Sequence, residues 1–288
     1  MASHAAPNPS PTVLLEDEHV LVLDKPPGWL VSGDGTRCIL NWARDRDIAA
    51  GYPADAIRLV HRLDRDTSGV LVLGRGEEAA RRLGAAFSER RVFKLYIALT
   101  NPVPAVRWAR VEHALRGRRE GKAERMEVVA EGGQLATSEV EVLARSRRFG
   151  LVRVLPEQGR KHQVRVALAE LGAPIAGDFL YGGARTARIA PRVMLHAYAL
   201  DLAHPFDEGR HLRLRATLPA DMVELFREDG GIAPLELDRR HKATPVAAPS
   251  RARPAASRPS TPKMPSLPPR AGGGRPRRSG GAGKAPKR

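Results

Sequence analysis

The chain has 288 residues, with 48 Lys or Arg against 32 Asp or Glu and a formal net charge of +16. Its single cysteine excludes a disulfide scaffold, a redox pair of cysteines and a zinc site built from several cysteines. The apolar runs are too short for a membrane-spanning helix, and the first residues lack the pattern of a secretory signal. We therefore expect a soluble, cytoplasmic protein.

The positive charge is concentrated near the C-terminus. Residues 239–288 contain 14 basic residues, ten prolines and no acidic residue, so residues 1–238 hold 34 basic and 32 acidic side chains. A segment so poor in large apolar residues cannot offset the entropy lost on ordering, and we expect this basic tail to be disordered. The tail is either a solubilising extension or an arm that binds RNA phosphates without regard to sequence.

The remaining chain alternates strand and helix patterns. Residues 1–11 are expected to be disordered, and residues 12–238 to form one domain. In chain order, the pattern predicts strands over 13–16 and 20–24, a helix over 38–50, a strand over 70–73, a helix over 77–91, strands over 92–100, 108–115, 125–130, 138–145 and 151–155, a helix over 161–171, strands over 193–202 and 212–216, and a helix over 220–228. This order predicts an α+β fold with a mainly antiparallel mixed sheet and flanking helices.

Three segments contain more polar groups than a plain core requires. The first is HRLDRDTSG at residues 61–69, directly before an apolar strand. Asp, Thr, Ser and Gly are favoured in such a turn because their side chains bond nearby backbone or tolerate positive φ. Asp64 therefore has a structural explanation as well as a chemical one. Asp64 and Asp66 together would also fit the carboxylate pair of a glycoside hydrolase.

The other two segments place polar side chains on regular elements. In FKLYIAL, residues 93–99, alternation puts Lys94 and Tyr96 on the polar face of a strand, where they either line a cleft or meet solvent. In EQGRKHQVR, residues 157–165, Arg165 lies beside the apolar stripe of the following helix. It can reach solvent from there, or it can pair with a buried carboxylate.

Together these segments resemble the RluA-type pseudouridine synthases. HRLDRDTSG is similar to that family's central catalytic motif, FKLYIAL to its Lys-x-Tyr-x-Ala strand, and GRKHQVR through GAPIAGDFLYGG (residues 159–183) to its third motif. LDKPPGWLV (residues 23–31) and residues 195–205 resemble its first and last motifs. The resemblance covers about residues 13–228 in the family's order. It implies the pseudouridine synthase catalytic fold and isomerisation of a uridine in ribosomal or transfer RNA.

The resemblance also assigns roles to individual residues. Asp64 would act on the sugar as nucleophile or base, Arg165 would balance its charge, and Tyr96 would stack on the uracil and help remove the proton from carbon 5. The residues expected to contact RNA are Arg62, His61, Lys161 and Gln163. Arg62 would fill the space left by the flipped uridine. His61 is expected to pack or to bond the backbone rather than to transfer protons.

The expected partner is RNA, bound by a monomer without an obligate protein partner or a membrane. The reaction moves a bond within one nucleoside, so we expect no cofactor, and the nine histidines show no metal-ligand spacing. The chain departs from the family at Ala167, where a His is common. The family often carries an RNA-binding domain of the S4 type before the first strand, and we do not expect one here. His61 stands where a related branch has Gly. The alternative is an RNA-binding or ribosome-assembly protein that has kept the fold without catalysis.

Overall fold

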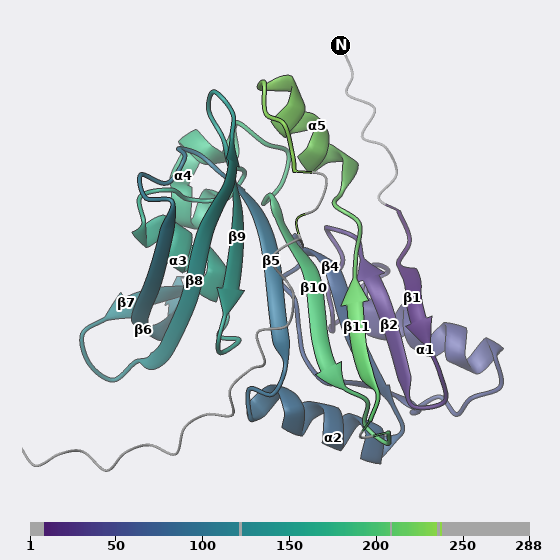
Figure 1. Cartoon of the computed structure of the whole chain (residues 1–288). Helices are drawn as coiled ribbons and strands as arrows, with labels where there is room; N and C mark the ends of the chain where they lie inside the picture. The colour runs from purple at the N-terminus through teal and green to yellow at the C-terminus, as the bar shows by residue number, and fades with distance from the viewer. Residues whose placement is uncertain (1–8, 121–122, 208, 235–236, 238–288) are drawn as a thin grey trace, which may run out of the picture. The chain divides into compact units, whose positions relative to one another are not determined.

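An eleven-stranded mixed sheet with five short helices makes up the computed structural model, which describes residues 9–120, 123–207, 209–234 and 237 (Figure 1). The basic tail, residues 239–288, lies outside the described residues. Within the described part, none of the helices has the length and apolar character needed to cross a membrane.

The elements have the following bounds. The strands are β1 (Thr12–Glu16), β2 (Val20–Lys25), β3 (Ile57–Leu59), β4 (Ser68–Arg75), β5 (Phe93–Thr100), β6 (Trp108–Glu120), β7 (Ala123–Val129), β8 (Gln134–Arg145), β9 (Gly150–Pro156), β10 (Leu195–Ala203) and β11 (His211–Arg215). The helices are α1 (Ile39–Ala49), α2 (Glu77–Ser88), α3 (Gln163–Glu170), α4 (Phe179–Ala187) and α5 (Ala220–Glu228).

The sheet has a short seam in its middle. Its strand order is β1-β2-β4-β10-β5-β9-β8-β6-β7, with β3 paired to β4 and β11 paired to β10. Every pairing is antiparallel except that of β4 with β10, which consists of two residue pairs, Ser68 with His196 and Gly69 with Ala197. Beyond these pairs the same edge of β10 turns to β11, through residues 199–203.

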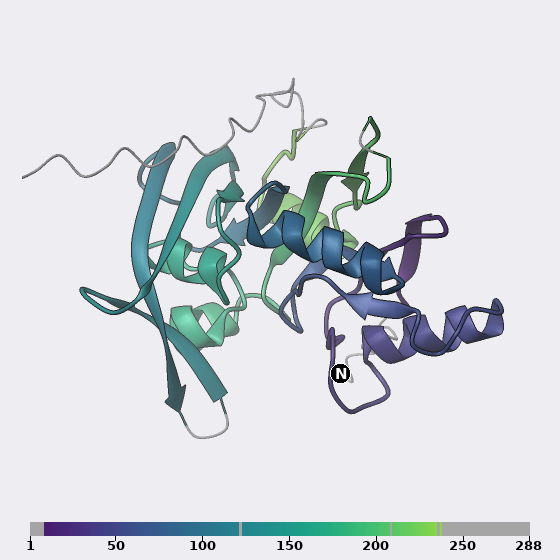
Figure 2. The same ribbon diagram turned by 90° about the horizontal axis from the view of Figure 1, so that it is seen from below.

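Strands β2 and β4 are buried on both faces, which explains their continuous apolar sequences. On one face Val22 packs in a cluster with Leu83 of α2. On the other face Leu21 packs in a cluster with Ile39 of α1. The two helices therefore cover opposite faces of this part of the sheet, as Figure 2 shows from below.

Gly69 allows the close approach at the seam. Its φ is +112°, and a Cβ at this position would lie 2.2 Å from the carbonyl oxygen of Ala197. One row of paired residues crosses the sheet here, from Lys25 through Gly69 and Ala197 to Tyr96 and Val154. The row brings together the segment LDKPPGWLV, the segment HRLDRDTSG and the strand that carries Tyr96.

The predicted α+β fold with a mainly antiparallel mixed sheet is confirmed. The pattern does not predict β3 or α4, and it ends β6 five residues early and starts β8 four residues late. Strand β3 has three residues, too few for a visible alternation. Helix α4 contains Gly182 and Gly183, and Gly183 has a φ of +70°. Glycine disfavours helix, so residues 179–187 read as loop from sequence alone.

Candidate active site

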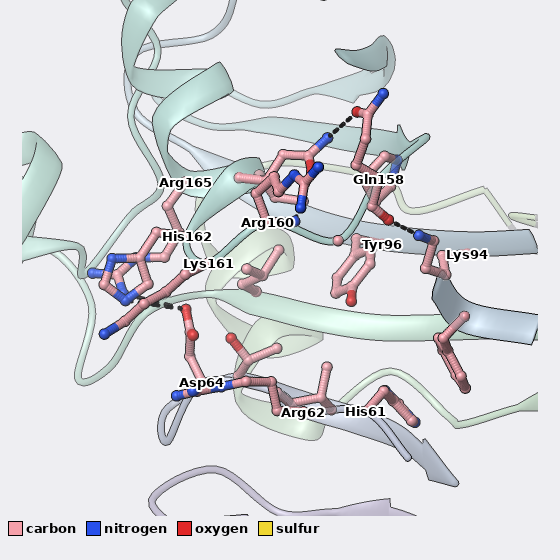
Figure 3. Close-up of a pocket in the computed structure, with 18 of the residues that line it drawn as sticks. His61, Arg62, Asp64, Lys94, Tyr96, Gln158, Arg160, Lys161, His162 and Arg165 are labelled. Atoms are coloured by element: carbon pink, nitrogen blue, oxygen red, sulfur yellow. Dashed lines mark hydrogen bonds and ion pairs between the residues drawn. The ribbon is translucent and has the colours of Figure 1, made fainter. Parts of the chain in front are cut away.

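A pocket of about 430 Å³ lies next to the seam. Its walls come from the loop between β3 and β4, from α2 and the turn after it, from β5, and from the segment that joins β9 to α3. Figure 3 shows how side chains from these segments face one another. The volume is typical of sites that bind small molecules or single nucleosides.

Asp64 and Arg165 meet at this pocket although they are 101 residues apart. The Nη1 atom of Arg165 donates to Oδ2 of Asp64 at 3.4 Å. The side chain of Asp64 is 22% exposed, so it is open to the pocket without projecting into bulk solvent.

A second carboxylate fixes the position of Arg165. Its Nε donates to Oδ2 of Asp178 at 2.7 Å and its Nη2 donates to Oδ1 at 2.8 Å, and the Asp178 side chain is completely buried. Burial opposes the charge of Arg165, but these hydrogen bonds and the charges of Asp178 and Asp64 raise its pKa above the ordinary value. The bidentate pair leaves Nη1 directed at Asp64.

Tyr96 lies across the pocket from Asp64, on β5 (Figure 3). Its hydroxyl points into the space that the two residues share. Burial raises the pKa of Tyr96 above its ordinary value, and the charge of Asp64 raises it further. The phenol is therefore neutral near pH 7, with its ring in the pocket wall.

Lys25, the last residue of β2, holds the loop that carries Asp64. Its side chain is completely buried, and its Nζ donates to the carbonyl oxygens of Pro26 at 3.0 Å and Arg65 at 2.8 Å. Burial lowers the pKa of Lys25 to about 7, although the charges of Asp66 and Asp64 act in the opposite direction. The residue after Asp64 is thereby tied to the end of β2.

Arg62 and His61 stand in the pocket wall in different ways. Arg62 is exposed, and it borders both the pocket and a shallower hollow on its other side. The ring of His61 stacks on Phe87 at 4.3 Å, and its Nε2 accepts a hydrogen bond of 2.8 Å from the Val72 N–H. Burial lowers the pKa of His61 to about 3, and the Lys94 charge adds to this effect. His61 is thus neutral and bonded to the backbone.

The side chain of Gln163 is held by protein partners. It is buried, and its Nε2 donates to the Thr137 carbonyl oxygen at 2.8 Å and to the Ser138 hydroxyl at 3.1 Å. Its Oε1 accepts from the Arg160 N–H at 3.0 Å. Protein partners therefore use both amide hydrogens, although Gln163 also lines the pocket, and its contact with RNA stays a prediction.

Lys161 and Lys94 are two of the basic residues that line the pocket. The Nζ of Lys161 forms an ion pair with Glu124 on β7 at 2.5 Å and remains partly exposed. The Nζ of Lys94 donates to the carbonyl oxygen of Gln158, which ties β5 to the segment before α3. Burial lowers the pKa of Lys94 to about 8, with the charge of Arg90 adding to the effect.

Asp66 lies outside the pocket. Its carboxylate accepts a hydrogen bond from Arg65 at 3.2 Å, and it is not among the residues that line the cavity. This placement counts against a glycosidase pair made by Asp64 and Asp66. Among the described residues, no group of three or more His, Cys, Asp or Glu could hold a metal ion.

Asp178, Tyr181 and His162 are site residues that the sequence reasoning missed. Asp178 begins α4, where its Oδ1 accepts from the Tyr181 N–H at 3.2 Å. His162 ends the loop before α3, and its Nε2 lies 3.7 Å from Oδ2 of Asp64. All three belong to the segments quoted above as similar to the third motif. No local pattern marked Asp178 and Tyr181, because they belong to α4 and its N-terminal cap, and the pattern does not predict this helix.

Comparisons with known proteins agree with this geometry. The sequence model of a family described as RNA pseudouridylate synthase matches residues 19–170. The ribosomal large subunit pseudouridine synthase D of Xanthomonas campestris is 37% identical over 259 residues, which cover 83% of this chain and 76% of that protein. The tRNA pseudouridine synthase C of Salmonella typhi is 35% identical over 241 residues, which cover 76% of this chain and 89% of that protein.

A solved structure is similar as well. The human RNA pseudouridylate synthase domain containing 4 aligns with a TM-score of 0.64 and 28% sequence identity. The alignment covers 77% of this chain and 94% of that chain.

Proposed function

Because the chain belongs to the RluA-type RNA pseudouridine synthases, we propose that it isomerises a uridine of ribosomal or transfer RNA with Asp64 as the reacting carboxylate. The contact between Asp64 and Arg165, in a pocket that also holds Tyr96, is the observation that supports this assignment most. Relatives whose names specify ribosomal RNA and transfer RNA both align over most of the chain, so both RNA classes belong to the proposal.

The reaction needs one carboxylate and no external electrons. The bond between the ribose C1′ and the uracil N1 breaks, the base turns, and C1′ bonds to C5. Asp64 acts on the sugar, either by attack on C1′ or by removing a proton from C2′. One proton leaves C5 and one is gained at N1, so substrate and product are isomers. This balance is the reason for proposing that no cofactor takes part.

Arg165 and Tyr96 then have complementary roles. Arg165, fixed on Asp178, keeps a positive charge beside the reacting carboxylate in a site that excludes most water. Preorganised charge of this kind requires no rearrangement during the reaction. The neutral ring of Tyr96 stacks on the extruded uracil, an interaction of about 1–3 kcal/mol, and its hydroxyl is directed to where the C5 proton departs.

RNA contacts are assigned to the basic side chains at the rim. The uridine leaves its stack at a cost of a few kcal/mol. The exposed side chain of Arg62 is long enough to take the vacated place and to contact phosphate. Lys161 serves the opposite rim when phosphate replaces Glu124 as its partner. We propose that the protein acts on RNA in this way as a cytoplasmic monomer.

The RNA target can be mapped directly. Pseudouridine forms stable carbodiimide adducts that stop reverse transcriptase, so stops are compared between a strain lacking the protein and its parent across ribosomal and transfer RNA. One or a few stops should disappear in the deletion strain and return with the wild-type chain. Unchanged profiles in every RNA class would contradict the proposed activity.

Two asparagine variants test the role of Asp64. Asp64→Asn should restore no stop while still binding the mapped RNA in a filter or gel assay. Asp66→Asn is the matched control, since Asp66 is two residues away and outside the pocket, and it should restore the stop. A protein that acts as a silent RNA chaperone would tolerate both changes equally.

A further inference from the structure

Both polar contacts of the Asp64 carboxylate fall on the same oxygen. Oδ2 lies 3.4 Å from Nη1 of Arg165 and 3.7 Å from Nε2 of His162. Within the described part of the chain, no hydrogen bond or ion pair involves Oδ1 of Asp64. We infer that His162 is a positioning residue that holds Oδ2 together with Arg165, so that Oδ1 is the oxygen presented to the sugar. The inference rests on the proposed role of Asp64.

The backbone of His162 aims its ring at Asp64. His162 has a φ of 55° and a ψ of 13°, the left-handed conformation, directly before α3. Non-glycine residues rarely adopt it, and His is among the side chains enriched there. A residue keeps such a conformation only where the surrounding structure holds it there. Here the surroundings are the first turn of α3, which the Val166 N–H joins by a 3.0 Å hydrogen bond to the His162 carbonyl oxygen.

A hydrogen-bond relay sets the tautomer of the ring. The Met126 N–H donates to the Tyr181 oxygen at 2.9 Å. The Tyr181 hydroxyl lies 2.8 Å from Nδ1 of His162. The Tyr181 hydroxyl can donate its proton to Nδ1 while its oxygen accepts from Met126, and the Asp64 carboxylate, which can only accept, favours a proton on Nε2, the nitrogen that faces it. With Nδ1 as acceptor, the proton of the neutral ring resides on Nε2.

The protonation states agree with this relay. Burial raises the pKa of Tyr181 to about 12, so the hydroxyl keeps its proton. Burial lowers the pKa of His162, and the charges of Arg165 and Lys161 lower it further against the opposing charge of Asp64. Arg165 also lies over the Tyr181 ring, with its Cζ 5.1 Å from the ring centre. Tyr181 thus supports both donors that approach Oδ2.

Two substitutions of His162 separate positioning from a purely structural role. Gln places an amide nitrogen near the location of Nε2, so it retains a donor for Asp64 but loses the acceptor for Tyr181. Asn places its amide near Nδ1, so it retains the contact with Tyr181 but loses the donor for Asp64. Asn also tolerates the left-handed conformation better than Gln does. A structural role therefore predicts that Asn is the better substitute, and a positioning role predicts that Gln is.

The rate of conversion of bound RNA is the quantity to measure. Under single-turnover conditions with saturating protein, His162→Gln should stay within about threefold of wild type, and His162→Asn should lose up to about 100-fold. The affinity for RNA should not change in either. Tyr181→Phe, which keeps the ring over Arg165, should lose less than His162→Asn. The control is His211→Asn, at an exposed histidine on β11, and it should match wild type.

Several outcomes would overturn the inference. An active His162→Asn with a slow His162→Gln would make the residue structural. Wild-type rates in both variants would remove its role altogether. If thermal unfolding shows that the His162 variants do not fold, Tyr181→Phe decides, since a wild-type rate contradicts the relay and a reduced rate supports it. Asp64→Ala is measured in parallel, because activity in that variant would refute the proposed function itself rather than the role of His162.

Discussion

The guanidinium of Arg165 is anchored on the carboxylate of Asp178 by two hydrogen bonds, and that carboxylate is completely buried. These hydrogen bonds fix the guanidinium, and its third nitrogen, Nη1, contacts Asp64. In the proposed mechanism Asp178 does not touch the substrate, so the position of Arg165 depends on a residue buried behind it. This arrangement has consequences for both rate and stability.

Replacing Arg165 by Lys should be severe despite the equal charge. An ammonium cannot bind both oxygens of Asp178 and still reach Asp64, because it lacks the planar fork. We expect conversion of bound RNA to fall about 100-fold or more, as when a preorganised donor is removed from an active site. Arg165→Met should also lower the free energy of unfolding by about 3–5 kcal/mol, since it leaves a buried carboxylate unpaired.

Single-turnover rates and urea unfolding measure the two effects. Arg81→Lys is the control, since Arg81 pairs with Glu78 on the surface of α2. It should change neither quantity noticeably, because exposed ion pairs contribute little. A similar response of both arginines would contradict the special position of Arg165.

Gly69→Ala should damage the fold at the seam. The new Cβ would lie 2.2 Å from the carbonyl oxygen of Ala197, and the φ of +112° is unfavourable for alanine. We expect a loss of about 2–5 kcal/mol in unfolding free energy from the strain and the overpacking together. Gly132→Ala has the same unfavourable sign of φ but open space around its Cβ, so it should cost only about 1–2 kcal/mol. Equal losses, measured by urea unfolding, would show that the clash is relieved.

The low pKa of His61 predicts that the free energy of unfolding decreases in acid. Its pKa is about 3 in the folded protein and about 6.5 in an unfolded chain. The unfolded state therefore binds more protons between these values, so stability is full above pH 6.5 and falls as the pH is lowered. The slope from this one group reaches about 1.4 kcal/mol per pH unit. Unfolding curves from pH 7 to 5 should be shallower in pH dependence for His61→Gln, and an unchanged slope would exclude a buried neutral imidazole.

The low pKa of Lys25 predicts a change in the free energy of unfolding in the alkaline range. With a pKa of about 7 folded and about 10.5 unfolded, it makes the unfolded state bind more protons between pH 7 and 10.5. This group therefore adds stability as the pH rises through that window. Lys25→Met should remove the increment between pH 7 and 9. It should also slow conversion about tenfold, because the Arg65 carbonyl next to Asp64 loses its anchor.

Part of this fold can be read from the sequence because β2 and β4 are buried on both faces, and α2 and α5 each bury one apolar face. The runs VLVL at residues 20–23 and 70–73 could only be core strands or short core helices, and their length favours strands. The seam could not be predicted. It depends on which strands pair across the sheet, and that is decided by Gly69 and Ala197 at a sequence separation of 128 residues.

The site was predictable in its residue types and only partly in its contacts. The motifs correctly indicated that Asp64, Tyr96 and Arg165 share one pocket, although local sequence alone left each with a structural explanation. The hydrogen bonds of Gln163 could not be predicted, because its partners, Thr137 and Ser138, come from a strand whose register no local pattern specifies. Asp178 escaped notice because it precedes α4, a helix that the pattern does not predict, and because its partner Arg165 lies on another helix.

The seam of β4 and β10 gives the pocket an unusual dependence on backbone geometry. Asp64 lies in the loop that enters β4 on one side of it, and Tyr96 and Arg165 come from β5 and α3 on the other. A small change in the twist between β4 and β10 would therefore move these side chains relative to one another. The distance between Oδ2 of Asp64 and Nη1 of Arg165 therefore depends on how the strands on the two sides of the seam are oriented.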